Sequence, residues 1–298
     1  MRVLITGSGG LVGRMVAHYC SSQGDLVRTL NHRGLDISDR DLVRQLVLAE
    51  KPDIVINCAA VTDVDGCELD PERAYAVNAR GPENLAIASG EAGALLVTIS
   101  TDYVFDGTKT GFYTQRDQPN PTSIYGQSKL DGERRAQQAL ARSIVVRTGF
   151  VFGLGGTNFL SMIVDRARRG EKLKAINDSF GTPTYAKDLA IRLRELAQRD
   201  LPGIYHVVNA GNGASYEEFA RHALDLSGFR ASEIESVETD ALNRPAPRPR
   251  NSRLKCLLSE AIGLPVLPDW RDALKDFVAA QRQADSIKQV PGEVAVSS

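Results

Sequence analysis

The stretch "RVLITGSGGLVGRMVA", residues 2–17, decides the fold class of this 298-residue chain. Its apolar run at 2–6 predicts a buried strand, and the residues after the glycines predict a helix that ends near residue 22. Glycines between a strand and a helix permit a sharp turn, close approach of the backbone to a pyrophosphate, and tight packing of helix on strand. The free N–H groups at the start of the helix then favour phosphate. The stretch therefore predicts a dinucleotide-binding loop that comprises Gly7, Gly10, Leu11, Val12 and Gly13.

Apolar runs and helical segments alternate over the residues that follow this loop. The runs are nearly apolar throughout, which is typical of parallel strands that are covered on both faces. We therefore predict an α/β fold with a Rossmann-type, doubly wound parallel sheet. Further strands are predicted at 26–30, 53–60, 95–101 and 143–153, and helices at 39–51, 71–93 and 128–140.

The regular alternation ends after Gly153, which indicates a change in organisation. A later strand at about 203–211 and a Pro/Arg-rich loop at 243–254 are the clearest features there. We predict a dinucleotide-binding domain, a smaller substrate-binding part and a disordered tail. The dinucleotide-binding domain comprises residues 1–149 and also receives about 184–210. The substrate-binding part comprises 150–183 and 211–282, and the tail comprises 283–298.

Composition and charge exclude several classes of partner. The formal net charge is −1 and no basic stripe with interleaved aromatic residues occurs, so nucleic acid is not expected as a partner. No apolar run is long enough for a bilayer or a signal peptide, so no membrane partner is expected. The four cysteines lack Cys-x-x-Cys spacing, and the four histidines form no metal-ligand pattern. We predict a cytoplasmic protein and assign no metal-ligating residues, and the need for a magnesium ion stays open.

The residues at the predicted ribose end of the cofactor site favour NADPH over NADH. An acidic residue about 20 positions beyond the loop would bind a ribose 2′-hydroxyl. This chain has "LNHRG" at 30–34, in which His32 and Arg33 replace the acid. Arg33 could pair with a 2′-phosphate, or it could be a solvated loop cation. We expect His32, Arg33 and Asp36 to contact the cofactor, and NADH stays open as an alternative.

Several motifs occur in an order that resembles a known family. They are "TGSGGLVG", "NCAAVTDVD", "YAVNARGPENLA", "ISTDYVFDG", "SIYGQSKLDGE" and "VVRTGFVFG". Together they resemble an extended short-chain dehydrogenase/reductase. The stretches "STDYVFDG", "NPTSIYGQSKLDGE", "NDSFGTPT" and "GIYHVVNAG" resemble, more narrowly, the dTDP-4-dehydrorhamnose reductases. The resemblance extends to about residue 280.

The resemblance implies a catalytic group of three residues. Tyr125 would be the general acid, Lys129 would lie between it and the nicotinamide ribose, and Thr101 would hydrogen-bond the reacting carbonyl. A nearby ammonium favours the phenolate, so we expect Lys129 to lower the pKa of Tyr125. Ser100 is adjacent to Thr101, but alternation along a strand directs its side chain to the other face.

Further site residues are implied one position at a time. Phe150 stands where close relatives often have a tryptophan over the sugar, so it would leave a stacking wall without an indole N–H. Expected cofactor contacts are Ala59, Ala60, Thr62 and Asn78, in addition to Tyr125 and Lys129. Expected substrate contacts are Asp102, Tyr103, Phe150, Asn177, Arg250 and Asn251.

The motifs together imply NADPH-dependent reduction of the C4 keto group of dTDP-4-dehydro-L-rhamnose to dTDP-L-rhamnose. A reductase or epimerase of another nucleotide-linked sugar uses the same machinery and is the first alternative. A non-catalytic NADP-binding regulatory subunit is the alternative from another class, because fold does not fix function. The nucleotide sugar would be the partner, and relatives include both monomers and homodimers.

Overall fold

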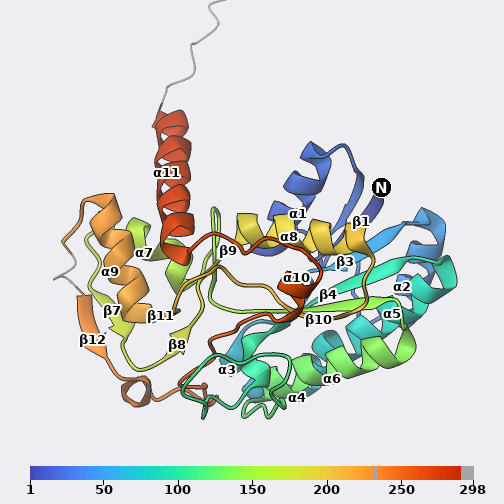
Figure 1. Cartoon of the computed structure of the whole chain (residues 1–298), viewed down its shortest axis with the longest axis horizontal. Helices are drawn as coiled ribbons and strands as arrows, with labels where there is room; N and C mark the ends of the chain where they lie inside the picture. The colour runs from blue at the N-terminus through green and yellow to red at the C-terminus, as the bar shows by residue number, and fades with distance from the viewer. Residues whose placement is uncertain (231–233, 290–298) are drawn as a thin grey trace, which may run out of the picture.

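A six-stranded parallel sheet forms the centre of the molecule in the computed structural model, which describes residues 1–230 and 234–289 (Figure 1). The strand order is β10-β5-β4-β3-β1-β2, and every neighbouring pair is parallel. The sheet confirms the predicted Rossmann-type fold. Its strands are β1 (Arg2–Thr6), β2 (Leu26–Leu30), β3 (Ile54–Asn57), β4 (Leu95–Thr101), β5 (Ser143–Thr148) and β10 (Gly203–His206).

The order of the strands reverses between β1 and β3, which places a crevice beyond their carboxyl ends. Ligands of open parallel sheets bind at such a switch point. β1 is followed directly by the glycine loop, and β4 ends at Thr101. The topology therefore brings the phosphate loop and the end of β4 to the same edge of the sheet.

Helices cover both faces of the sheet, as Figure 1 shows. Alternate residues of each strand enter different cores: Val3 and Ile5 pack towards α1 and α8, and Leu4 packs towards α2 and α5. Burial on both faces explains why the strands read as continuous apolar runs. One face carries α1 (Leu11–Ser22) and α8 (Ala186–Arg199), and the other carries α2 (Arg40–Glu50), α5 (Gly81–Ala92) and α6 (Ile124–Ala139).

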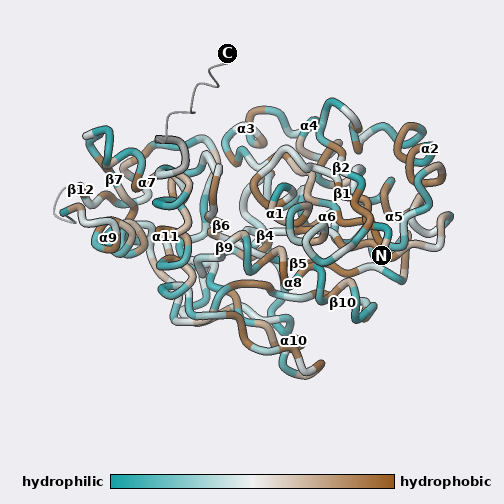
Figure 2. The backbone as a smooth tube through the Cα atoms, turned by 90° about the horizontal axis from the view of Figure 1, so that it is seen from above, coloured by the Kyte–Doolittle hydropathy of each residue, from teal (hydrophilic) through white to brown (hydrophobic). Residues whose placement is uncertain are grey.

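A second core lies beside the sheet and contains large aromatic side chains, among them Phe152, Phe219, Trp270 and Phe277. Figure 2 shows its helices gathered at one end of the molecule. The assignment of this part to substrate binding stays a prediction. Its elements are β6 (Val151–Phe152), α7 (Phe159–Arg168), β7 (Leu173–Ile176), β8 (Phe180–Gly181), β9 (Thr184–Tyr185), β11 (Ala214–Ser215), α9 (Tyr216–Ser227), β12 (Ile234–Val237) and α11 (Trp270–Gln289). The short helix α10 (Leu258–Ala261) lies beside β10 instead, and the residues that flank it pack against the core of the sheet.

Two predicted elements are interrupted in the structure. The strand predicted at 143–153 divides into β5 and β6, because Phe150 between them has a φ of 46°, which no strand residue adopts. The helix predicted at 71–93 divides into α4, a π-helical turn and α5, and ends at Gly93 in the left-handed conformation. The remaining short elements are α3 (Val64–Leu69), α4 (Pro71–Tyr75), the π-helical turn Ala76–Arg80 and the 3-10 turns Asp102–Val104 and Thr239–Leu242.

The end of the chain is more ordered than we expected. We predicted disorder from residue 283, but α11 continues to Gln289, and residues 290–298 lie outside the described residues. Polar contacts with α7 and α9 stabilise the helix: Gln281 donates to Asp165 at 2.9 Å, and Arg282 donates to the carbonyl of Leu226 at 2.5 Å. Among the described helices, none is both long and apolar enough to cross a membrane.

Candidate active site

The glycine loop has the geometry of a phosphate cradle. Gly7 has a φ of 66°, and a Cβ on Gly13 would lie only 2.3 Å from the carbonyl oxygen of Gly7. Gly10 caps α1 without any side-chain hydrogen bond. The first N–H groups of α1 therefore have no intrahelical acceptor and point at the crevice with the positive end of the helix dipole. These residues fit the pyrophosphate of a dinucleotide.

Buried polar side chains connect the ends of β1 and β3 with the middle of β4 next to the crevice. The Thr6 hydroxyl donates to Asn57 Oδ1 at 2.6 Å, and Asn57 Nδ2 donates to Thr98 Oγ1 at 3.1 Å. The same Asn57 oxygen accepts the N–H of Ala59 at 3.1 Å. This network fixes the turn after β3, so that Ala59 and Ala60 line the cavity beside the glycine loop.

Asn78 lies in the π-helical turn, fully buried, and braces the next loop. Its side chain accepts the N–H of Val61 at 2.9 Å and donates to the Val61 carbonyl at 3.0 Å. It also donates to the hydroxyl of Ser128 on α6 at 3.2 Å. π-helical turns frequently occur at functional sites. Asn78 thus connects the loop that carries Thr62 with the helix that carries Tyr125.

Thr101, Tyr125 and Lys129 converge on one cavity of about 730 Å³, which also reaches the start of α1. Thr101 is the last residue of β4. Helix α6 begins four residues earlier than predicted, because the Ser123 side chain caps it by accepting the N–H of Gly126. Tyr125 consequently lies in the first turn and Lys129 one turn later on the same face.

Burial dominates the electrostatics of the tyrosine and lysine. It raises the pKa of Tyr125 above its ordinary value. We expected Lys129 to lower the pKa of Tyr125, but the structure directs the Lys129 ammonium to the carbonyl of Ile99, at 2.6 Å. Burial lowers the pKa of Lys129 to about 8, and the charge of Glu133 opposes this shift.

Two aromatic side chains form part of the cavity wall. The rings of Phe150 and Tyr216 lie with centroids 4.3 Å apart, and both line the cavity. Gly181 makes room for the Phe150 ring, since a Cβ there would lie 2.3 Å from it. Asp102 and Tyr103 also line the cavity. Phe150 therefore lines the cavity beside Tyr216, and its stacking on a sugar stays a prediction.

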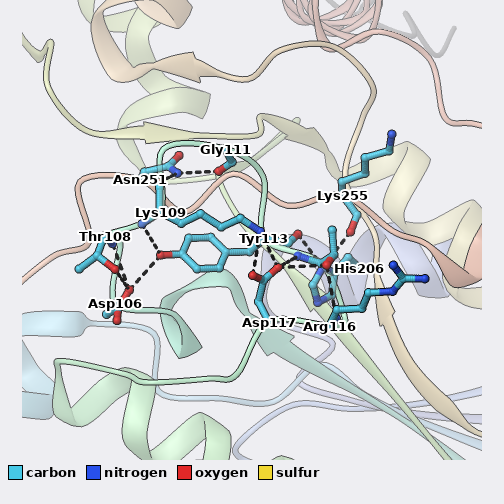
Figure 3. A network of polar contacts seen from close by, with 11 residues as sticks. Asp106, Thr108, Lys109, Gly111, Tyr113, Arg116, Asp117, His206, Asn251 and Lys255 are labelled. Carbon is cyan, nitrogen blue, oxygen red and sulfur yellow. Dashed lines mark hydrogen bonds and ion pairs between the residues drawn. The ribbon is translucent and has the colours of Figure 1, made fainter.

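Three expected substrate residues lie outside the lining of this cavity. Asn177 donates to the hydroxyl of Ser236 at 2.8 Å, and Arg250 forms ion pairs with Asp178 at 2.6 Å and Asp240 at 2.7 Å. The Asn251 amide donates to the carbonyls of Lys109 and, at 2.8 Å, Gly111, as Figure 3 shows. Their polar groups are occupied within the protein, so the structure offers no support for direct contacts by them.

The residues expected at the ribose end lie outside that lining as well. His32, Arg33 and Asp36 are exposed on the loop after β2. Asn31 shapes this loop, because its side chain accepts the N–H groups of Arg33 and Gly34 at 3.0 and 3.2 Å. Within the described part of the chain, the Arg33 side chain has no hydrogen bond or ion pair. Its guanidinium is thus available for an anion.

The sequence reasoning missed Tyr216 and Arg244 in the cavity wall. Tyr216 begins α9, more than 60 residues from Phe150, so no local pattern connects the two rings. Arg244 comes from the Pro/Arg-rich loop, where composition alone could not show which arginine faces the cavity. Arg248 of the same loop pairs with Asp65 at 2.6 Å instead. In residues 1–230 and 234–289, no group of three or more potential metal-ligating side chains occurs.

Comparisons with known proteins agree with this geometry. The family model of the RmlD substrate binding domain matches residues 1–283. A dTDP-4-dehydrorhamnose reductase of Mycolicibacterium smegmatis is 40% identical over 282 residues, which cover 94% of this chain and 85% of that protein. A probable dTDP-4,6-dihydroxy-2-methyloxan-3-one 4-ketoreductase of Streptomyces antibioticus is 35% identical over 287 residues, with 94% and 97% covered.

A solved structure is also similar over almost the whole chain. The dTDP-4-dehydrorhamnose reductase of Bacillus anthracis strain Ames, in complex with NADP, has a TM-score of 0.90 and 33% sequence identity. The match covers 94% of this chain and 99% of that one. Because the family model matches almost the whole chain and a relative is 40% identical, the chain belongs to the dTDP-4-dehydrorhamnose reductase family, within the extended short-chain dehydrogenase/reductases.

Proposed function

We propose that this chain reduces the C4 keto group of dTDP-4-dehydro-L-rhamnose to a hydroxyl with NADPH and so forms dTDP-L-rhamnose. The observation that carries the proposal is the convergence of Thr101, Tyr125 and Lys129 on one cavity beside the glycine loop. The names of the relatives supply the substrate, and the NADP complex of the Bacillus anthracis protein supports the cofactor.

Each of the three residues has a chemical role in this reduction. Bound NADPH would supply hydride to C4 of the sugar. Tyr125 donates its phenolic proton to the C4 oxygen, on which negative charge develops. The Thr101 hydroxyl holds that oxygen in place. Lys129, whose ammonium donates to the carbonyl of Ile99, supplies a positive charge at the cavity wall and would face the nicotinamide ribose. Burial of all three excludes water, so each interaction is stronger than it would be in solution.

The cavity divides between the two ligands in this proposal. The start of α1 and the turn with Ala59 and Ala60 hold the cofactor, while Phe150 and Tyr216 face the sugar. Arg33 would bind the 2′-phosphate, since its side chain is exposed and unpaired within the described residues. Arg244 replaces Arg250 as the arginine nearest the expected diphosphate, because it lines the cavity and Arg250 is paired with two aspartates.

A reductase of another dTDP-linked keto sugar is the second candidate. Two observations support it: the name of the Streptomyces antibioticus relative, and Phe150 in place of the expected tryptophan. A phenyl ring stacks on a sugar but offers no N–H donor, so it discriminates less between hydroxyl arrangements.

The proposal is tested by mixing the purified protein with NADPH and enzymatically generated dTDP-4-keto-6-deoxyhexose, with the 3,5-epimerase present. We expect NADPH absorbance to fall and dTDP-rhamnose to form. Tight NADPH binding without turnover would instead favour another keto sugar or a regulatory subunit. A homodimer and a cytoplasmic location stay predictions, and light scattering after size-exclusion chromatography tests the first.

A further inference from the structure

The carboxyl group of Asp102 has no part in the steps above, although it lies beside Thr101. It is 3% exposed, and both of its oxygens accept hydrogen bonds from hydroxyls. Oδ1 accepts from Thr101 at 3.0 Å, and Oδ2 accepts from Ser252. Gly149 makes room for the group, because a Cβ there would lie 2.4 Å from the Asp102 carboxyl. The Asp102 carboxyl is thus enclosed by Thr101, Ser252 and Gly149.

The contact with Thr101 creates a conflict over one proton. A threonine hydroxyl has a single proton to donate. In the structure that proton goes to Asp102, while the Thr101 oxygen accepts the N–H of Tyr103 at 3.2 Å. A hydroxyl that donates to Asp102 cannot donate at the same time to the carbonyl oxygen of a substrate. The protonation state of Asp102 therefore determines whether the Thr101 hydroxyl can donate a hydrogen bond to the substrate.

The second hydroxyl comes from the other part of the molecule. Ser252 belongs to the Pro/Arg-rich loop, and its N–H donates to the carbonyl of Phe180 at 2.8 Å. The neighbouring Asn251 is held by the carbonyls of Lys109 and Gly111 (Figure 3). Leu254 of the same loop forms a bridge with Tyr113. These contacts fix the position of the Ser252 hydroxyl, which reaches Asp102 across the junction between the two parts.

We infer that Asp102 is a positioning residue that controls the direction of the Thr101 hydroxyl, and that Ser252 sets the balance between its two states. As a carboxylate, Asp102 takes the Thr101 proton. As a carboxylic acid, it donates to the Thr101 oxygen and frees the Thr101 proton for the C4 oxygen of the substrate. In this change one proton from the solvent binds to the Asp102 carboxylate, the Thr101 hydroxyl rotates, and no other bond forms or breaks. The inference rests on the proposed reduction.

Electrostatics allow both states near neutrality. Burial raises the pKa of Asp102 to about 6, and the hydrogen bonds from Ser252 and Thr101 oppose that rise. The titratable groups that face Asp102 are the phenols of Tyr103, Tyr125 and Tyr216, and burial raises the pKa of each. These phenols stay neutral where Asp102 titrates, so the change in charge belongs to Asp102.

Two substitutions separate this role from a structural one. In Asp102→Asn the amide oxygen accepts from Ser252, so the NH₂ group faces Thr101 and imitates the protonated acid. We expect the wild-type kcat to decline as pH rises through about 6 and Asp102→Asn to lack this inflection. Ser252→Ala removes a hydrogen bond that lowers the pKa of Asp102, so its inflection should move to higher pH. Asp102→Ala leaves the Thr101 hydroxyl without a partner that directs it, so its kcat should lie about tenfold below that of the wild type at low pH, where Asp102 is protonated, and should lack the inflection.

Exposed positions supply matched controls: Asp225→Asn on α9 and Ser21→Ala on α1 should leave the inflection where it is in the wild type. The protonation of Asp102 is also measured without turnover, as the carboxyl C=O stretch in infrared difference spectra between wild type and Asp102→Asn. In the wild type the band of the protonated acid should appear as the pH falls through about 6, and in Ser252→Ala it should persist to higher pH. Failure of the proposed function alone would leave this band intact while no reduction occurs. Absence of the band, or an unchanged inflection in both variants, overturns the inference.

Discussion

The buried ion pair between Glu133 and Arg147 should contribute far more to stability than a surface pair of the same geometry. Glu133 lies on α6 and Arg147 on β5, with a shortest N···O distance of 2.6 Å and side chains that are 2% and 4% exposed. Three hydrogen bonds join the two groups. Glu133→Gln leaves the guanidinium charged and buried without its counter-charge, which costs about 3–5 kcal/mol in such pairs. Because Gln retains an acceptor, we expect a loss of about 3 kcal/mol.

The chain offers a matched control on its surface. Arg44 and Glu91 lie 2.7 Å apart, but their side chains are 55% and 37% exposed. Exposed pairs contribute about 0–1 kcal/mol, so Glu91→Gln should change the free energy of unfolding by less than about 1 kcal/mol. Urea denaturation with linear extrapolation measures both losses. Equal losses in the two variants would refute the reasoning, since burial is the main difference between the pairs.

Glu133→Gln should also change the pH dependence of catalysis. The charge of Glu133 raises the pKa of Lys129, which burial has lowered to about 8. Without that charge the pKa of Lys129 falls further. The alkaline limb of kcat should therefore move to lower pH in Glu133→Gln and stay in place in Glu91→Gln.

Three further predictions concern single side chains. Lys129→Met should abolish reduction yet raise the free energy of unfolding by roughly 3 kcal/mol at most near neutrality, because burial lowers the pKa of Lys129 to about 8. The unfolded lysine keeps its proton up to about pH 10.5, so wild-type stability should rise between about pH 8 and 10.5 and approach that of the variant. A variant less stable than the wild type near neutrality would contradict this. Burial lowers the pKa of His206 to about 3, so the stability of the wild type should decrease as the pH falls below about 6.5. The decrease should be less steep in His206→Gln, and acid titration followed by circular dichroism measures both. Parallel curves for the two proteins would disprove the prediction. Gly13→Ala forces a Cβ against the Gly7 carbonyl and should weaken NADPH binding by about a hundredfold in fluorescence titration, whereas Gly90→Ala, where a Cβ meets only Leu140 at 3.5 Å, should bind normally.

The sheet and its cofactor loop could be predicted because local patterns determine them. Residues 2–30 show a strand, a glycine turn, a helix and a second strand, and the structure has each within a residue or two. The convergence of Thr101, Tyr125 and Lys129 on one cavity could also be predicted, because these residues lie at a strand end or on one helix face, and their catalytic roles stay a proposal. The prediction was weaker where tertiary contacts override local preference, as at Phe150, which Gly181 and Tyr216 hold at a positive φ inside an apolar run.

The part predicted to bind substrate depends on contacts between distant segments, which the sequence does not display. β7 and β12 pair in parallel although about 60 residues separate them, and each is only four residues long. In the Pro/Arg-rich loop, Asp65 on α3 binds Arg248, and Asp178 binds Arg250. Those partners decide which arginine remains free to face the cavity, and their positions emerge only from the folded chain.

The rate of NADPH oxidation by Tyr125→Phe tests the central claim most directly. The substitution removes one oxygen from the phenol and leaves its ring, which packs edge-on against Tyr103 at 5.9 Å. With enzymatically generated dTDP-4-dehydro-L-rhamnose, we expect the wild type to reduce the sugar and the variant to show no measurable reduction, while both bind NADPH with similar affinity. A variant that turns over at the wild-type rate would contradict the assignment of Tyr125 as the proton donor, and with it the proposed mechanism.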